Sequence, residues 1–259
     1  MSDQNIAKQK AGEYAATFIE TGMTIGIGTG STVYYFIQAL AKKIKEKKLV
    51  IKGVPTSRQT ELLAAELNIP LVDLNDVSKL DLTVDGADEI DPELQLIKGG
   101  GGALLQEKIV AAASKKLIII ADETKLVDTL GKFPLPVEVI TFAWKQTQQH
   151  IQQLGCSKAT LRTKDGKIFV TDHAHYILDC YFEKIENAIQ LNQQLNNITG
   201  TYTVSSDCTG TMALQLAPNF TLHLFFVIDS GGDGFQAIET EPGLAITRIG
   251  RRILPGKAI

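Results

Sequence analysis

The sequence has few of the residues that most often build a metal centre or a disulfide framework. Its 259 residues include three cysteines, Cys156, Cys180 and Cys208, whose spacing matches no metal-ligand pattern. So small and odd a number favours reduced core or surface thiols in a cytosolic protein. Of the four histidines, His173 and His175 would face the same side of a strand and could bind a metal there. A half-exposed surface pair is the expected arrangement, and we predict no bound metal.

Long apolar runs and an excess of charge are also missing. No stretch reaches the roughly 18 apolar residues that a membrane span needs. The polar start at residues 1–5 lacks the apolar segment of a secretory signal. A formal net charge of −3 gives no sign of a nucleic-acid partner, and the one basic run, residues 42–48, is expected to be the solvated end of a helix. We expect a cytoplasmic protein that binds neither membrane nor nucleic acid.

Over the first half of the chain, segments with apolar residues at helical spacing alternate with short runs of apolar, β-branched residues. The expected helices span about residues 4–20, 33–44, 57–67 and 104–113, and the expected strands span residues 24–27, 50–54, 71–72, 80–84 and 116–121. This alternation predicts a doubly wound α/β domain with a mostly parallel sheet. Ligands of such domains bind outside the carboxyl ends of the strands.

The pattern changes near Gly131, where a proline-containing crossover at residues 132–139 begins. Beyond it the sequence predicts a helix, a hairpin, a strand and a second helix at residues 144–154, 161–170, 176–180 and 185–195. Asp165-Gly166 is a strong signal for the hairpin turn. We predict a large α/β domain over residues 1–131, a second, smaller α+β domain over residues 132–199, and a divergent tail over residues 200–259 that could return to the first domain.

A glycine-rich segment at residues 26–32, Gly-Ile-Gly-Thr-Gly-Ser-Thr, joins the first strand to a helix. Free N–H groups and the helix dipole make such a helix N-terminus suited to phosphate. The segment has neither the Gly-Lys-Ser/Thr of a Walker A loop nor the full Gly-x-Gly-x-x-Gly of a dinucleotide-binding fingerprint. A tight turn with a Ser or Thr helix cap is the plainer alternative.

A second group of polar residues follows the predicted strand at residues 80–84. Asp85-Gly86-Ala87-Asp88-Glu89 comes directly after it, Lys98 precedes four glycines, and Glu107 lies in the first turns of the next helix, where it is expected to point back to the same cleft. A carboxylate can move a proton between carbons, a lysine can stabilise an oxyanion, and free N–H groups can hold anionic oxygens. The plainer alternative for Asp88 is a helix cap.

Four motifs occur together in one order: Gly-Thr-Gly-Ser-Thr at 28–32, Asp-Gly-Ala-Asp-Glu-Ile at 85–90, Lys-Gly-Gly-Gly at 98–101 with Glu107, and Lys-Phe-Pro-Leu-Pro-Val-Glu-Val at 132–139. Over about residues 4–199 the chain resembles type A ribose-5-phosphate isomerases. The resemblance implies an aldose–ketose isomerase of the pentose phosphate pathway that interconverts ribose 5-phosphate and ribulose 5-phosphate without a metal or cofactor. It also implies a homodimer or homotetramer, with residues 1–131 as the catalytic domain.

The resemblance, together with position, also implies roles for individual residues. Glu107 is the carbon acid/base, and Lys98 stabilises the oxyanion of an enediolate. Asp85 relays protons between sugar oxygens, and Asp88 assists opening of the furanose ring. Singly, a lysine such as Lys125 is a surface residue by default. In this company it is a phosphate candidate, and the resemblance implies that it holds the phosphate together with Ser31, Thr32 and Lys8. The implied substrate-binding residues are Lys8, Thr29, Gly30, Ser31, Thr32, Gly86, Ala87, Gly99, Gly100, Gly101 and Lys125.

Two other classes of protein share related folds. Sugar-phosphate sensors of this fold carry a DNA-binding module ahead of the effector domain, and the 23 residues before the strand at Thr24 are too few for that module. Amino-sugar phosphate deaminases and coenzyme A transferases are fold relatives with other chemistry. Lys98 with its glycines, and Asp85, speak against them.

The resemblance ends near Gly200. A genuine extension and a change of reading frame would both produce so abrupt an end. In either case residues 201–259 must cover an apolar sheet edge, with Leu222–Ile228 as the candidate strand, or leave that edge exposed.

We predict that residues 201–259 are the least well packed part of the chain, because they do not supply recognisable family-type closing strands. Hydrogen exchange measures this directly, since amide protection reports the free energy of local opening. Amides of the tail should exchange faster than those of the predicted central strand at residues 117–121. Equally slow exchange in both segments would refute the prediction.

Overall fold

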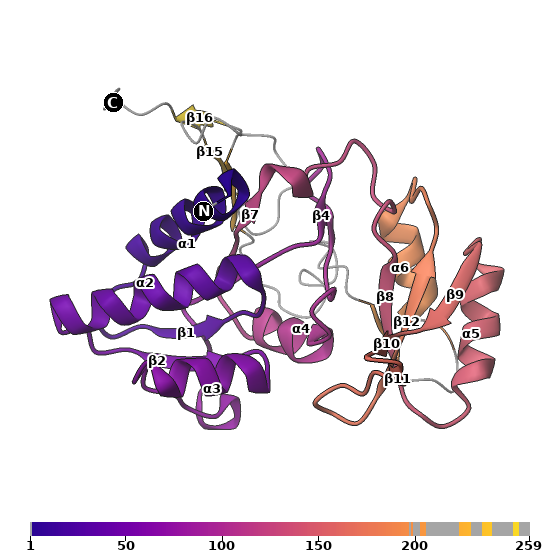
Figure 1. The fold of residues 1–259 in the computed structure, drawn as a ribbon, viewed down its shortest axis with the longest axis horizontal. Coiled ribbons are helices and arrows are strands. Elements are labelled where there is room, and N and C mark those ends of the chain that lie inside the picture. Colours follow the sequence, from indigo (N-terminus) through magenta and orange to yellow (C-terminus); the bar gives the residue numbers. More distant parts are fainter. Residues whose placement is uncertain are drawn as a thin grey trace. The chain divides into compact units, whose positions relative to one another are not determined.

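The computed structural model describes residues 2–196 and residue 198, together with the backbone of four later strands. The chain forms two compact units (Figure 1). The first unit comprises residues Met1–Ala87, Ile109–Leu126 and Ala213–Ile259, and the second comprises Asp88–Lys108 and Val127–Met212. The chain therefore leaves the first unit directly after Ala87. The domain boundaries expected from the sequence stay a prediction.

The first unit is built on a parallel sheet with the strand order β2-β1-β3-β6. These strands are Thr24–Ile27 (β1), Lys52–Pro55 (β2), Leu82–Asp85 (β3) and Leu117–Ile119 (β6). Ile27, the last residue of β1, pairs with Pro55 at the end of β2 and with Val84 near the end of β3. The carboxyl ends of these strands therefore meet at one edge of the sheet, which is where ligands of such folds bind.

Helices cover both faces of this sheet. The helices are Asp3–Thr17 (α1), Ser31–Lys47 (α2), Arg58–Glu66 (α3) and Leu104–Ala112 (α4). Helices α1 and α2 lie side by side (Figure 1) and share a buried core with Ile25 and Ile27 of β1. Gly26 presents the opposite face, where a Cβ atom would lie 2.6 Å from the Val110 side chain of α4. Helices on both faces make this the doubly wound α/β fold that the sequence predicts.

A separate sheet of order β16-β15-β14-β7 begins directly after β6 and includes the later part of the chain. After Ile120 the chain forms β7 (Ala121–Asp122), which pairs in parallel with β14 (His223–Ile228). Two further strands, β15 (Phe235–Glu239) and β16 (Arg251–Ile253), add to β14 in antiparallel fashion. The expected strand at 222–228 is therefore confirmed, whereas the packing of the tail concerns residues outside the described part of the chain and stays a prediction.

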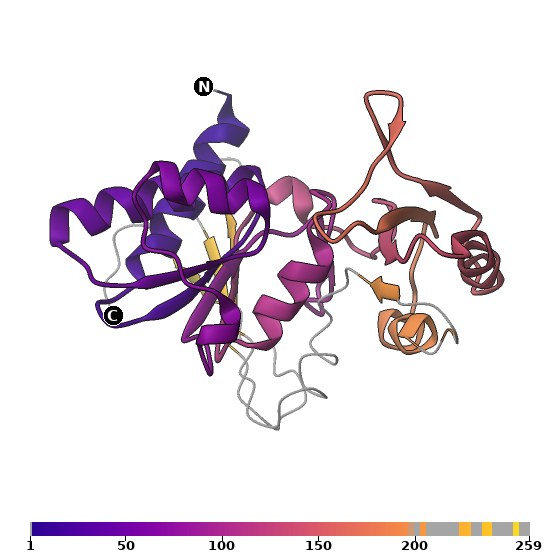
Figure 2. The same cartoon turned by 90° about the horizontal axis from the view of Figure 1, so that it is seen from below.

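The second unit is a smaller α+β layer pair. Its antiparallel sheet has the order β13-β8-β12-β9. The strands are Leu135–Val139 (β8), Lys158–Leu161 (β9), Tyr176–Tyr181 (β12) and Thr203–Ser205 (β13), and the helices are Trp144–Gln153 (α5) and Ala188–Asn196 (α6). Alternate residues Leu135, Val137 and Val139 of β8 share one core with Ile151 of α5 and Leu195 of α6. Both helices therefore cover the same face of the sheet (Figure 2).

Two short ribbons complete the second unit. One pairs Glu89–Ile90 (β4) with Leu96–Ile97 (β5), and the other pairs Thr163–Lys164 (β10) with Lys167–Ile168 (β11). Asp165 and Gly166 connect β10 to β11 with φ angles of 53° and 74°. Positive φ at both central residues is the signature of a type I′ turn, so the hairpin predicted from Asp-Gly is confirmed. The hairpin extends as a long arm from its unit (Figure 2).

Two predicted elements differ from the observed ones. The expected strand Leu71–Val72 is reduced to a single bridge between Leu71 and Gly53, because Asp73 caps a 3₁₀ turn (η1, Leu74–Asp76) that ends the extended stretch. The last predicted helix begins later than residue 185. The Asn187 side chain accepts a hydrogen bond from the Gln190 N–H and so caps α6 at its observed start.

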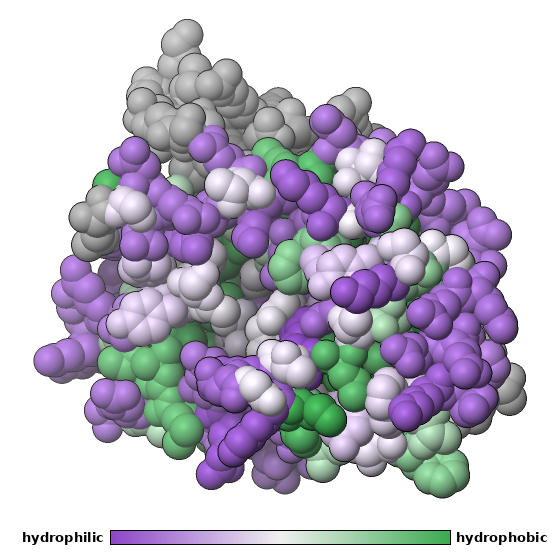
Figure 3. All heavy atoms as spheres, turned by 45° about the vertical axis from the view of Figure 1, so that its right-hand side comes forward, coloured by the Kyte–Doolittle hydropathy of each residue, from purple (hydrophilic) through white to green (hydrophobic). Residues whose placement is uncertain are grey.

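Two of the three cysteines and both members of the expected histidine pair lie within the described residues. Cys156 and Cys180 are free thiols in the core of the second unit, and Cys208 lies outside the described residues. His173 lies in a turn and His175 directly precedes β12, where His175 Nδ1 is 3.0 Å from Glu138 Oε1. Hydrophilic residues (purple) cover most of the face in Figure 3. No helix among the described residues is long and apolar enough to cross a membrane.

Candidate active site

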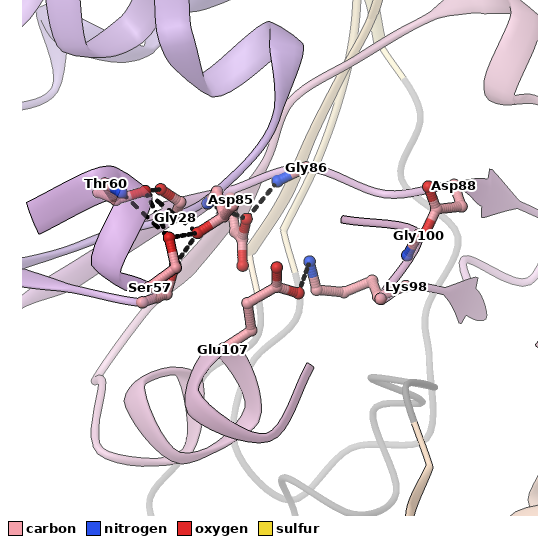
Figure 4. A network of polar contacts seen from close by, with 12 residues as sticks. Gly28, Ser57, Thr60, Asp85, Gly86, Asp88, Lys98, Gly100 and Glu107 are labelled. Carbon is pink, nitrogen blue, oxygen red and sulfur yellow. Dashed lines mark hydrogen bonds and ion pairs between the residues drawn. The ribbon is translucent and has the colours of Figure 1, made fainter. Parts of the chain in front are cut away.

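Asp85 is the last residue of the central strand β3, and its side chain is buried at the carboxyl edge of the sheet. Its Oδ1 atom accepts hydrogen bonds from the Gly86 N–H at 2.8 Å and the Thr29 N–H at 3.1 Å (Figure 4). A Cβ atom on Gly28 would lie 2.3 Å from the same oxygen. Only glycine at position 28 therefore lets the loop after β1 approach this carboxylate so closely.

A cluster of hydroxyl groups fixes the loop that follows β1. The Thr29 hydroxyl lies 2.7 Å from Thr56 Oγ1 and 2.8 Å from Ser57 Oγ, and the Thr60 hydroxyl donates to the Gly28 carbonyl at 2.7 Å. Ser57 also caps α3, because its side chain accepts a hydrogen bond from the Thr60 N–H. The roles of Thr56 and Thr60 were not predicted. A usable signal exists for Thr56, because it directly follows β2 and so lies at the same strand edge.

The N-terminus of α2 carries no side-chain cap. Gly30 is the N-cap residue, with a φ of 128°, and Ser31 and Thr32 are already helical. The alternative in which a Ser or Thr caps this helix is therefore wrong. A 17-residue helix that begins after a glycine loop presents its first N–H groups and the positive end of its dipole together. This arrangement is suited to an anion.

Lys8 lies against the start of the same helix. Its Nζ atom donates to Ser31 Oγ at 3.0 Å and lies 3.8 Å from Asp122 Oδ2, an oxygen of a buried carboxylate on β7. Asp122 also caps the 3₁₀ turn Glu123–Lys125 (η2) that carries Lys125. The structure thus brings Lys8 and Ser31, two predicted phosphate ligands, into contact. The part of Asp122 in orienting Lys8 was not predicted.

In the second unit, Lys98 and Glu107 form a buried ion pair. The Lys98 Nζ atom lies 3.1 Å from Glu107 Oε2, and the two side chains are 4% and 5% exposed (Figure 4). Lys98 follows β5, and Glu107 lies in the first turn of α4. Burial of two opposite charges carries a large desolvation cost, so such a pair is weak evidence for stability alone. A carboxylate and an ammonium held this close suit proton transfer beside a developing oxyanion.

The four glycines after Lys98 form a tight turn, here called the glycine turn (residues 99–102). The Gly102 N–H donates to the Gly99 carbonyl at 3.0 Å, and both residues have positive φ. The Gly100 N–H donates to Asp88 Oδ2 at 2.7 Å, and a Cβ atom on Gly100 would lie 2.5 Å from the other carboxylate oxygen. Asp88 is therefore a partner of the glycine turn, and its alternative role as a helix cap is wrong.

Glu89, next to Asp88, has a different function. Its two carboxylate oxygens accept from the Gly131 N–H at 2.7 Å and the Phe133 N–H at 2.5 Å, and its side chain is buried. Glu89 thereby fixes the start of the crossover at residues 132–139. Among the described residues, no group of three His, Cys, Asp or Glu side chains is arranged to hold a metal ion.

Comparisons with known proteins agree on one family. A family model described as ribose 5-phosphate isomerase A (phosphoriboisomerase A) matches residues 52–209. A ribose-5-phosphate isomerase A of Bacillus cereus is 63% identical over 194 residues, which cover 74% of this chain and 87% of the relative.

Solved structures give the same result. The ribose 5-phosphate isomerase A of Methanocaldococcus jannaschii is 36% identical with a TM-score of 0.80, over 91% of this chain and 99% of that chain. A D-ribose-5-phosphate isomerase in complex with phospho-erythronic acid is 39% identical with a TM-score of 0.76, over 86% of this chain and 95% of that chain.

The close approach of Gly28 to Asp85 leads to a test of packing. We predict that Gly28→Ala lowers the free energy of unfolding by roughly 1–3 kcal/mol, because the added methyl group must displace the buried carboxylate. Denaturant unfolding measures the change. Gly86→Ala is the matched control, since a Cβ atom there meets only ordinary contacts at 3.8 and 3.9 Å. Equal stability of the two variants would contradict the prediction.

Proposed function

Because the chain belongs to the ribose 5-phosphate isomerase A family, we propose that it interconverts ribose 5-phosphate and ribulose 5-phosphate in the pentose phosphate pathway. The reaction moves a proton between C2 and C1 of the open-chain sugar through an enediolate. The observation that carries the proposal is the buried contact of 3.1 Å between Lys98 and Glu107. A proton transfer at carbon needs a carboxylate base and a nearby cation for the oxygen that becomes negative.

We propose that Glu107 removes the proton from C2 of the aldose and returns it to C1. The Lys98 ammonium and the amides of the Gly99–Gly101 turn stabilise the enediolate oxygens while the carbon is deprotonated. The burial of Lys98 supports this role, because the attraction between its ammonium group and a negative oxygen is stronger in a buried site than in water. The reported complex of a relative with phospho-erythronic acid, a phosphorylated sugar acid, fits a site for an anionic intermediate.

Two further carboxylates handle protons on oxygen. Asp85 relays a proton between the two sugar oxygens, and Asp88 assists opening of the furanose ring. Each carboxylate accepts backbone N–H groups, Asp85 from Thr29 and Gly86 and Asp88 from Gly100. These hydrogen bonds hold both carboxylates in fixed positions, as a proton relay requires.

The phosphate group is bound by the other predicted ligands. Lys8, Ser31, Thr32 and Lys125 supply cations, hydroxyl groups and the N–H groups of the α2 terminus. Thr29, Gly30, Gly86 and Ala87 complete the substrate site. The contact of Lys8 with Ser31 at 3.0 Å supports this assignment.

We further propose a cytoplasmic homodimer or homotetramer that needs no metal or cofactor. A non-catalytic sugar-phosphate sensor would have no use for a buried lysine–glutamate pair, so we do not adopt that alternative. A coupled assay with ribose 5-phosphate, with and without a chelator, tests the activity. Turnover should be equal in both, and absence of turnover would reject the function.

Glu107→Gln is expected to lower kcat by roughly 10²–10⁴-fold, the usual contribution of a general base. Glutamine keeps the size of the side chain and can still accept a hydrogen bond from Lys98. It removes the charge that compensates Lys98, so kcat is calculated per folded enzyme. Steady-state kinetics with ribose 5-phosphate measures the loss, and Glu93→Gln, at an exposed position of the same unit, is the control. An unchanged kcat would remove Glu107 from this role.

Lys98→Ala should lower kcat far more than it raises KM, because its interaction with the enediolate strengthens in the transition state. Lys125→Ala should act mainly on KM, since the phosphate is held throughout the reaction. The kcat is calculated per folded enzyme, because loss of one partner from a buried ion pair also destabilises the fold. The reverse pattern would mean that the two roles are exchanged.

A further inference from the structure

Arg162 contacts the glycine turn from the base of the β10–β11 hairpin. Its Nη1 atom donates to the Gly99 carbonyl at 2.9 Å and to the Gly100 carbonyl at 3.1 Å. Both carbonyls belong to the turn that directly follows Lys98. The Arg162 side chain is 14% exposed, so these contacts are largely shielded from water.

Asp179 holds the other side of the same guanidinium group. Arg162 Nε lies 3.2 and 3.1 Å from the two Asp179 oxygens, and Nη2 lies 2.5 Å from Oδ1. Asp179 is in the middle of β12, between the core residues Leu178 and Cys180. A bidentate arginine–carboxylate pair has a defined geometry, so the sheet sets the direction of the remaining guanidinium donors.

A second residue of the hairpin base contacts the same turn. The Phe169 N–H donates to the Arg162 carbonyl at 2.9 Å, which makes these two residues neighbours across the hairpin. A Cβ atom on Gly102 would lie 2.6 Å from the Phe169 ring. The hairpin base therefore touches the glycine turn at residues 99–100 through Arg162 and at residue 102 through Phe169.

We propose that the hairpin base is a positioning site for the glycine turn, with Arg162 as its main positioning residue. The proposal rests on the proposed function. A peptide unit is planar, so a carbonyl and the N–H of the next residue have fixed opposite directions. The contact of Arg162 with the Gly99 carbonyl thus directs the Gly100 N–H that binds Asp88, and its contact with the Gly100 carbonyl directs the Gly101 N–H.

An external clamp is needed here because the turn has no side chains of its own. Glycine has more accessible backbone conformations than any other residue. The alternative conformations must be excluded if the N–H groups of the turn are to keep fixed directions. Arg162 supplies two hydrogen bonds to the turn and several to Asp179 from one rigid plane, which lysine cannot do. Loss of the clamp should therefore cost preorganisation of the amides and of Asp88 rather than phosphate binding.

Arg162→Met is the main test. We expect kcat for ribose 5-phosphate to fall roughly 10- to 100-fold, the scale of an ångström-sized misplacement, with KM changed less than about twofold because the phosphate ligands are elsewhere. Affinity for phospho-erythronic acid should fall, while affinity for inorganic phosphate stays the same. Arg162→Lys should restore only part of kcat, and Asp179→Asn should lower it. Lys167→Met, at an exposed site on the same hairpin, is the control.

Three outcomes would overturn the proposal. One is a kcat of Arg162→Met within about twofold of the parent chain. Another is an equal loss of phosphate and phospho-erythronic acid affinity together with a lower unfolding midpoint, which marks a purely structural role. The third is full rescue by lysine. If the parent chain does not turn over ribose 5-phosphate, the proposed function fails, whereas a selective loss of phospho-erythronic acid affinity in Arg162→Met would still support the clamp.

Discussion

An ammonium group and a carboxylate that are buried together depend on each other, because either one alone would stand uncompensated in a low dielectric. For Lys98 and Glu107 the cost of removing one partner is on the order of 3–5 kcal/mol. Their contact at 3.1 Å therefore needs a backbone that holds both residues in place. The glycine turn and the first turn of α4 are that backbone, and their geometry is the constraint on which this ion pair depends.

Asp85 and Asp88, which lie on either side of the point where the chain leaves the first unit, are also held in place by the backbone. Asp85 is held by the N–H groups of Thr29 and Gly86, and Asp88 by that of Gly100. In each case a glycine is required because a Cβ atom would collide with the carboxylate. Glycine makes the approach possible but leaves the backbone loose. Hydrogen bonds from the hydroxyl groups around Thr29 and from the guanidinium group of Arg162 restrict the backbone of these two loops.

Much of the fold and of the candidate site follows from local pattern. β3 and β6 are short apolar runs, and the polar motifs directly follow strands, so parallel pairing alone predicts their common edge. The contacts that orient these motifs could not be predicted in this way. Arg162 is 63 residues from Gly99, and a lone arginine beside a hairpin carries no local signal. The strand predicted at residues 71–72 is longer than the single bridge observed at Leu71, because the 3₁₀ turn capped by Asp73 ends the extended stretch.

The strand β14 brings the later chain to bear on one part of this arrangement. It pairs Val227 with Ala121 and Ile228 with Asp122, the residue whose carboxylate lies 3.8 Å from Lys8 Nζ. Strand register is set by such pairing, so β14 helps to fix the backbone that carries Asp122. The ion pair of Lys98 and Glu107 is fixed by different elements, β5 and α4. Changes in β14 should therefore disturb the Lys8–Asp122 contact before the Lys98–Glu107 ion pair, and so affect the proposed phosphate binding before the proposed proton transfer.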